Sequence, residues 1–138
     1  MTVHLLKVAV GEESIDDLRR WHATRLRKHG RLWHATRMVP RRASEVIDGG
    51  SIYWIIKGAI RVRQRILDIE DVVGPDGRKC VLLLDPDLVP TEPVPRRPHQ
   101  GWRYLEVGDA PADLGDVAPG VQEMPAEMVA ELRELGLL

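Results

Sequence analysis

The residues with the clearest chemical potential lie between positions 19 and 42. This stretch of 24 residues carries nine Lys or Arg side chains and no Asp or Glu. Trp21 and Trp33 are interleaved with these cations, together with three histidines. Cationic side chains bind phosphates, and aromatic faces accept stacked bases. The stretch therefore predicts a surface for nucleic acid, with an affinity that falls as salt is added.

Individual contacts can be assigned by residue type. Arginine pairs with phosphate through two parallel hydrogen bonds, and a stacked Trp is worth roughly 1–3 kcal/mol per base. Core packing is the competing interpretation for Trp54 and Trp102, and a solvated sheet exterior competes for the arginines of 61–65. The predicted ligand-contacting residues are Trp33, Arg37, Arg41, Arg42, Lys57, Arg61, Arg63 and Trp102, with Trp54 as a further stacking candidate.

The pentapeptide Trp-His-Ala-Thr-Arg occurs twice, at 21–25 and at 33–37. A spacing of 12 residues is too short for a solenoid repeat. We expect the first copy to be helical and the second not. Coincidence or a small local duplication is therefore the preferred interpretation.

Signatures of catalysis are missing. His22 and His34 lack the i, i+4 partner of a zinc-binding helix, and no phosphate-binding glycine loop occurs. Cys80 is the one cysteine, which excludes a disulfide or cysteine-based zinc site within the chain and fits a packing role. Asp85 and Asp87 could form a carboxylate pair, but a turn explains them equally well. We predict no metal and no cofactor, and the balance is against an enzyme.

Composition limits the class of protein. With 138 residues and a formal net charge of −1, the chain has the length of a single domain and is not globally basic. It shows no signal peptide and no apolar run of the roughly 20 residues that a membrane helix needs. We expect a soluble cytoplasmic protein. Residues 105–138 carry one Arg and eight acids, so this segment could cover the basic stretch or pair with it between subunits.

The first half of the chain gives clear element signals. Alternation predicts a strand over 2–10, and Ser14 and Gly30 bracket a helix with acids at its start and bases at its end. A short strand could lie within 32–39, and a short helix follows over 40–47. The unbroken apolar run of 51–57 indicates a buried strand.

The second half is predicted to be mainly extended. Residues 60–84 read as a long hairpin around a turn at Gly74–Gly77, with a strand that bends as at a barrel corner. The prolines of 87–98 exclude a helix and a central strand and favour an extended surface segment. A closing strand over 101–107 and a loop over 108–124 precede a helix from Pro125, whose apolar face comprises Met128, Val129, Leu132 and Leu135.

These elements predict an α+β domain over 1–138, built on a small mixed or antiparallel β-barrel flanked by helices. Residues 116–138 would add a C-terminal loop and helix. Four short stretches resemble a bacterial domain family of unknown function that is common in alphaproteobacteria, over about residues 2–115. They are Gly50–Gly58, Arg63–Ile66, Leu84–Pro86 and Gln100–Leu105.

The order of these elements is also similar to the PUA-like superfamily, which includes ASCH and EVE domains. That resemblance implies a barrel that binds RNA or a modified nucleobase in a cleft beside its helices. We therefore expect a binding module for RNA or a nucleobase-containing ligand. The alternatives are an interaction module that forms a charge-paired homodimer, and an enzyme acting on a nucleotide-like ligand.

Overall fold

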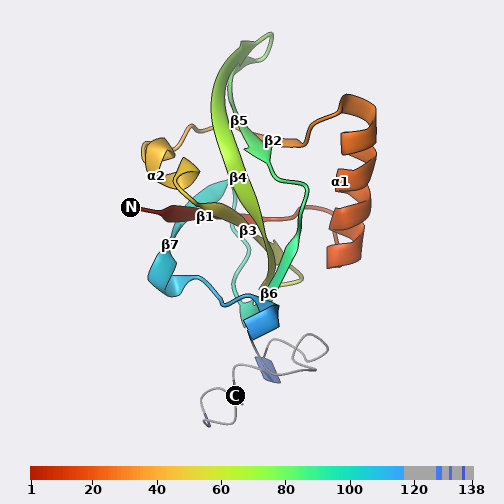
Figure 1. Cartoon of the computed structure of the whole chain (residues 1–138), viewed down its shortest axis with the longest axis vertical. Coiled ribbons are helices and arrows are strands. Elements are labelled where there is room, and N and C mark those ends of the chain that lie inside the picture. The colour runs from red at the N-terminus through yellow and green to blue at the C-terminus, as the bar shows by residue number, and fades with distance from the viewer. Residues whose placement is uncertain (117–126, 129–130, 132–134, 136–138) are drawn as a thin grey trace.

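Seven strands form one sheet with helices at its sides (Figure 1). The computed structural model describes residues 1–116, 127–128, 131 and 135. The elements in chain order are β1 (Val3–Val8), α1 (Ile15–His29), β2 (Trp33–Thr36), α2 (Ala43–Ile47), β3 (Ser51–Ile56), β4 (Ala59–Gly74), β5 (Gly77–Leu84), β6 (Val89–Pro95), β7 (Trp102–Glu106) and the 3-10 turns η1 (Val107–Asp109) and η2 (Leu114–Asp116).

The strand order is β2-β5-β4-β3-β1-β7, and β6 pairs with β4 beside this path. The pair β1–β3 is parallel, and all other pairs are antiparallel. The predicted α+β class and mixed sheet are thus confirmed. The path runs from β2 to β7 as an open sheet. Closure into the predicted barrel is not shown among the described residues.

Helix α1 has the boundaries that its end residues predict. The Ser14 side chain accepts a hydrogen bond from the Asp17 backbone, and Gly30 adopts a left-handed conformation (φ 73°) in which its N–H donates to Leu26. Leu18 and His22 are buried, while Trp21 points outward and is 41% exposed. The helix therefore packs one narrow stripe on the sheet and presents its basic side to solvent.

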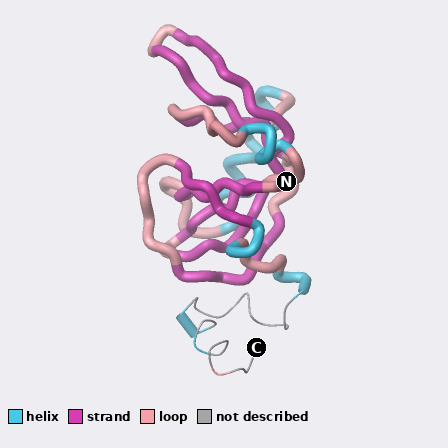
Figure 2. The backbone as a smooth tube through the Cα atoms, turned by 90° about the vertical axis from the view of Figure 1, so that its left-hand side faces the viewer, coloured by secondary structure: helices cyan, strands magenta, loops and turns pink. Residues whose placement is uncertain are grey.

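The long strand β4 bends twice, at register shifts opposite β3 and opposite β5. Its first half pairs with β3 and β6, and its second half continues into the β4–β5 hairpin, which projects from the rest of the molecule (Figure 2). The turn at Gly74–Gly77 is confirmed. Because successive side chains of β3 point to opposite faces of the sheet, two separate apolar clusters form, one centred on Trp54, Ile56 and Val62, the other on Tyr53, Ile55 and Ile60.

The proline-rich segment differs from the prediction. It is extended, but residues 89–95 form β6, and its middle residues Thr91, Glu92 and Pro93 are buried rather than on the surface. Proline lacks an N–H and fits a strand that pairs on one side. β6 pairs with β4 on one side. On its other side Thr91 forms a single bridge with Asp113 and the Glu92 N–H donates to the Ala112 carbonyl at 2.9 Å, so non-proline residues make the bonds there.

The C-terminal prediction lies largely outside the described residues. Glu127, Met128 and Glu131 are helical and exposed, and Leu135 is exposed, but Val129 and Leu132 are not described. Among the described residues, no helix is both long enough and apolar enough to span a membrane.

Candidate nucleic-acid interface

The predicted ligand-contacting residues do not form one cluster. Lys57 and Arg61 line a cleft between α1 and the strands β4 and β6. Arg42 and Trp102 lie where α2 meets β7, and Trp33 lies on β2 beside the end of α1. Five of the eight candidates therefore fall into three groups, and Arg37, Arg41 and Arg63 lie outside them.

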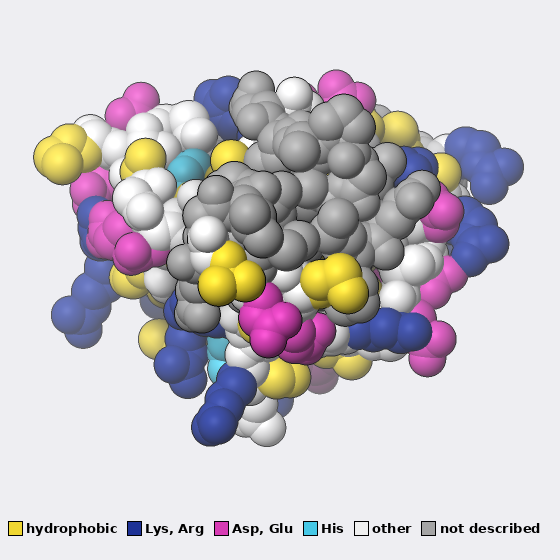
Figure 3. Space-filling model, turned by 90° about the horizontal axis from the view of Figure 1, so that it is seen from below, with side chains coloured by type: hydrophobic (Ala, Val, Ile, Leu, Met, Phe, Trp, Pro, Cys, Tyr) yellow, Lys and Arg dark blue, Asp and Glu magenta, His cyan; other side chains and the backbone are white. Residues whose placement is uncertain are grey.

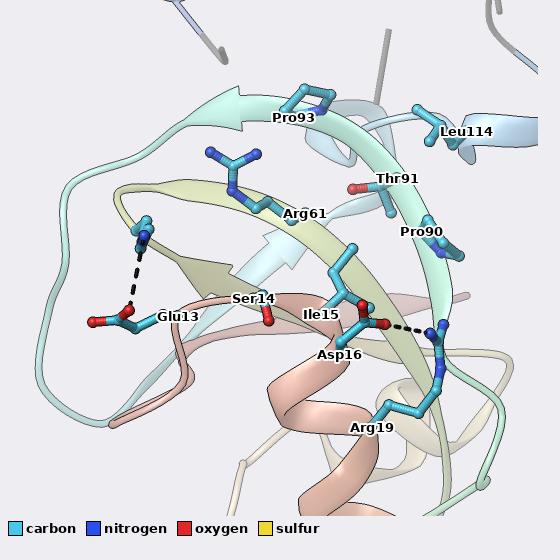
Figure 4. A pocket seen from close by; sticks show the side chains of 11 residues that line it. Glu13, Ser14, Ile15, Asp16, Arg19, Arg61, Pro90, Thr91, Pro93 and Leu114 are labelled. Carbon is cyan, nitrogen blue, oxygen red and sulfur yellow. Dashed lines mark hydrogen bonds and ion pairs between the residues drawn. The ribbon is translucent and has the colours of Figure 1, made fainter. Parts of the chain in front are cut away.

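The first group lines a cleft of about 460 Å³ that also receives the start of α1 (Figure 4). Arg61 extends across this space from β4, and its Nε donates to the Ile56 carbonyl at 3.0 Å. The acids of the cleft are paired, Asp16 with Arg19 at 3.0 Å and Glu13 with Lys57 at 4.0 Å. Arg61 is therefore its one cation without a carboxylate partner among the described residues.

Two of the predicted arginines are engaged by carboxylates. Arg63 binds both oxygens of Asp113 at 2.7 and 2.8 Å, which raises the pKa of Arg63 and lowers that of Asp113. Arg42 binds Glu45 at 2.8 Å and Glu106 at 2.7 Å. These pairs tie η2 and α2 to the sheet, so both guanidiniums have structural partners.

Trp102 is held in place by its ring nitrogen, which donates to the Met38 carbonyl at 2.9 Å. Its ring packs edge-on against Tyr104, with centroids 4.9 Å apart. Trp54 is 2% exposed, so the core-packing interpretation holds for it. Arg37 and Arg41 are exposed and form no ion pair within residues 1–116.

The two copies of the pentapeptide meet in space. Arg25, which ends the first copy, places its guanidinium carbon 4.2 Å from the Trp21 ring centroid and 4.9 Å from that of Trp33. Its Nη1 also donates to the Trp33 carbonyl at 2.9 Å. A Trp–Arg–Trp stack of this kind, which we call the Trp21–Arg25–Trp33 platform, joins α1 to β2.

The histidines of the two copies meet on the other side of this junction. His22 and His34 line a cleft of about 190 Å³ together with Lys7, Trp21 and Trp54. The His34 ring packs edge-on against Trp54 with centroids 5.2 Å apart. The antiparallel pair β1–β7 and the parallel pair β1–β3 set Trp102, Lys7 and Trp54 in one row beneath this cleft.

Burial keeps both imidazoles neutral. It lowers the pKa of His22 to about 4, with help from the Arg25 charge. Burial also lowers the pKa of His34 to about 4, with smaller effects from Lys7, Arg25 and His22. Two neutral imidazoles so close to the cations Lys7 and Arg25 can serve as hydrogen-bonding groups without adding charge.

The tautomer of His22 follows from its partner Gln64. The Gln64 amide nitrogen donates to the Asp85 carbonyl at 2.8 Å and lies 3.4 Å from His22 Nδ1, while its oxygen accepts from Trp54 Nε1 at 3.2 Å. Because an amide nitrogen can only donate, Nδ1 accepts and the proton lies on Nε2. His34 Nε2 is buried and has no hydrogen-bond partner in the described chain. The cleft thus offers a donor and an unpaired ring nitrogen.

Sequence reasoning did not select His22, His34, Lys7 or Arg25. Three of them belong to the repeated pentapeptide, for which the sequence alone favours coincidence or a small local duplication. The two copies differ in secondary structure, since one copy is helical and the other lies mostly in β2. The pairing of β2 with β5 nevertheless turns the second copy toward α1.

The basic stretch keeps much of its charge uncompensated. Arg19, Arg20, Arg31 and Arg42 form ion pairs with nearby acids. Five further cations of the stretch form none with any described residue, and these are Arg25, Arg27, Lys28, Arg37 and Arg41. Whether the acidic segment covers the stretch, one of the two alternatives above, lies outside the described residues, because 117–126, 129–130, 132–134 and 136–138 are not described.

The face seen from below has a different character. There, Lys and Arg side chains lie around the outline and alternate with Asp and Glu (Figure 3). Mixed charge of this kind is typical of an ordinary solvated surface. The uncompensated cations of α1 therefore stand out against it.

Metal binding and thiol chemistry find no support in the described residues. They contain no group of three His, Cys, Asp or Glu side chains placed to hold a metal ion. Cys80 is buried, and burial raises the pKa of its thiol to about 11, so the thiolate nucleophile is not formed near neutral pH. The Asp85 carboxylate accepts from the Asp87 backbone at 2.9 Å, as in a turn.

Comparison with known proteins gives one match. A family model described as a protein of unknown function (DUF1489) matches residues 5–138. No curated protein and no solved structure matches the chain.

Proposed function

We propose that this chain, which belongs to the DUF1489 family, is a binding module for RNA or a nucleobase-containing ligand. The observation that carries the proposal is the Trp21–Arg25–Trp33 platform, where two aromatic rings and a guanidinium stack next to uncompensated cations. Aromatic rings and arginine planes bind bases with little sequence preference.

Phosphate binding is assigned to the cations beside the platform. Arg27 and Lys28 lie in the last turn of α1, two and three residues after Arg25, and are exposed. Arg37 and Arg41 follow β2, and Arg61 extends the basic surface at the other end of α1. Arg42, Lys57 and Arg63 are left out because each has a carboxylate partner.

We assign to the cleft of His22 and His34 the role of binding the edge of one base. Its volume of about 190 Å³ suits one ring system, and its imidazoles supply hydrogen-bonding groups between apolar walls. Discrimination would come from these groups, because a stacking platform alone accepts any base. The partner is thus a single strand or a free nucleotide, whose base edges are open.

A PUA-like fold is part of the same proposal. What supports it is the behaviour of β4, which bends at two register shifts and pairs in turn with β3, β5 and β6. Bulged strands are typical of barrel corners. The cleft between α1 and the sheet occupies the place where such a module would take its ligand.

The test is a salt titration of binding. Labelled single-stranded RNA is titrated with the full chain in filter-binding assays from low to moderate salt, and log affinity should fall linearly with log salt. Arg27→Gln with Lys28→Gln should reduce the slope by about 1–2, since each phosphate contact contributes about 0.7 for single strands. Arg78→Gln at the tip of the projecting hairpin is the matched control.

Absence of salt-dependent binding at any ionic strength would overturn the proposal. So would an equal loss in the control variant. Light scattering in the same buffers tests the charge-paired homodimer, which predicts a salt-sensitive dimer that binds no RNA.

A further inference from the structure

The loop between β6 and β7 encloses a hollow that the function proposed above does not use. Its volume is about 490 Å³, and its lining consists of Pro95, Arg96, Arg97, Pro98, His99 and Arg103. Three guanidiniums and an imidazole thus surround one space, and no carboxylate of the described residues lines it. We call it the arginine hollow.

The backbone holds these side chains from both ends. Arg96 N donates to the Gly58 carbonyl at 2.8 Å, which attaches the loop to the β3–β4 turn. Arg103 lies on β7, opposite Leu6 of β1. Pro95 and Pro98 fix their own φ angles near −65°, which restricts the loop between these anchors. The cations are therefore positioned by the fold rather than carried on a free tail.

The charge of the hollow is uncompensated. None of its three arginines forms an ion pair or a side-chain hydrogen bond with residues 1–116, whereas Arg42 and Arg63 elsewhere each bind carboxylates. Like charges held together repel unless an anion neutralises them. This arrangement is therefore most stable with an anion between the guanidiniums.

His99 adds a hydrogen-bonding group inside the hollow. Both of its ring nitrogens are buried and make no hydrogen bond of ordinary geometry within the described part. Burial lowers the pKa of His99, the charges of Arg103, Arg96 and Lys7 lower it further, and a weak contact with the Gln100 backbone opposes them. A neutral imidazole still carries one N–H, which can donate to an oxyanion.

We propose that the arginine hollow is a phosphate-binding site, in which Arg96, Arg97 and Arg103 bind phosphoryl oxygens and His99 donates to the same group. Phosphate is preferred over a carboxylate because it offers three or more acceptor oxygens and two negative charges, which match several guanidinium forks. The proposal needs neither base stacking nor a polymer, so it goes beyond the function proposed above.

Calorimetric titration of the full chain tests this site, with inorganic phosphate and pyrophosphate as probes at low ionic strength. We expect saturable binding at one site, with pyrophosphate the tighter probe. Arg97→Gln and Arg103→Gln should each weaken it about tenfold or more, since a charge-assisted hydrogen bond is lost. The matched control Arg78→Gln, an exposed arginine on β5 that pairs with Asp71, should leave it within about twofold.

No binding of either probe at millimolar concentration would overturn the site. So would an equal loss of binding in the Arg78→Gln control. Thermal unfolding by circular dichroism confirms that each variant is folded, and these side chains are exposed enough for substitution to spare the core.

Two sources of the phosphate are separated by a second set of titrations. A short RNA with a 5′ phosphate is compared with the same RNA lacking it. Tighter binding of the phosphorylated strand, lost in Arg103→Gln, assigns the hollow to chain ends, whereas equal binding assigns it to free or small-molecule phosphate. RNA that binds without its phosphate while the inorganic probes do not bind overturns this site alone. Probes that bind while RNA does not overturn only the function proposed above.

Discussion

At the scale of single residues, position in the fold decides the chemistry of the histidines. His22 and His34 are ordinary imidazoles in the sequence, with no spacing that marks a site. The fold buries both beside Trp54 and near Lys7 and Arg25, and this environment makes them neutral. The sequence could not predict this burial, because the burial of a lone histidine depends on which strands the fold packs against it.

These histidines predict a pH dependence of stability. Their pKa is about 4 in the folded chain and near 6.5 when unfolded, so the unfolded chain binds more protons between these values. The free energy of unfolding therefore falls as pH drops from about 6.5 towards 4. The expected loss is on the order of 2 to 3 kcal/mol for each imidazole.

Urea unfolding at several pH values measures this effect. In His34→Gln the decline between pH 6.5 and 4 should be shallower than in the wild-type chain, because one proton-binding difference is gone. A decline of equal steepness in both chains would show that His34 does not titrate in this way.

At the scale of elements, local signals predicted most of the boundaries. Ser14 and Gly30 cap α1, and the apolar run at 51–56 forms β3 with every residue buried. The proline-rich segment shows the limit of these local signals. Its prolines exclude a central strand, but they do not reveal that the segment pairs with β4 to form β6. Pairing between distant segments, as in β1 with β3, has no local signal at all.

Gly50 is the element-scale position with the clearest steric requirement. A side-chain carbon there would lie 2.2 Å from the Val46 carbonyl oxygen and 2.5 Å from that of Val3, where α2, β1 and β3 meet. Gly50→Ala must push these backbones apart and should destabilise the fold by about 2 kcal/mol or more. Chemical denaturation measures the change.

Gly108 is the matched control for that substitution. A side-chain carbon at Gly108 meets no atom within 4 Å, so Gly108→Ala should change stability by less than about 0.5 kcal/mol. Equal stability of the two variants would contradict the close approach at Gly50.

At the scale of the whole molecule, a net charge of −1 conceals local regions with an excess of positive charge. The basic stretch keeps five cations without an ion-pair partner in the described chain, and the arginine hollow adds three that the charge pattern did not indicate. The stretch could be predicted because its cations are consecutive in sequence. Arg96 and Arg97 of the hollow are also adjacent in sequence, but only the fold shows that Arg103 of β7 and His99 face the same space.

The predicted site residues also divide into features that the sequence predicts and features that only the fold shows. Residue type indicated phosphate and base binding, and Lys57 and Arg61 do line one cleft. Arg42 and Arg63 form ion pairs with Glu106 and Asp113 from distant parts of the chain. Residue type alone cannot reveal such pairs. The Trp21–Arg25–Trp33 platform required the second pentapeptide to turn toward the first.

Photo-crosslinking of the full chain to single-stranded RNA, followed by mass spectrometry of the crosslinked peptides, tests the central claim most directly. The account predicts crosslinks concentrated at Trp21 and Trp33, reduced severalfold in Arg25→Gln and by added salt. Crosslinks that are absent, or that lie away from residues 19–42 and are indifferent to Arg25, would contradict it.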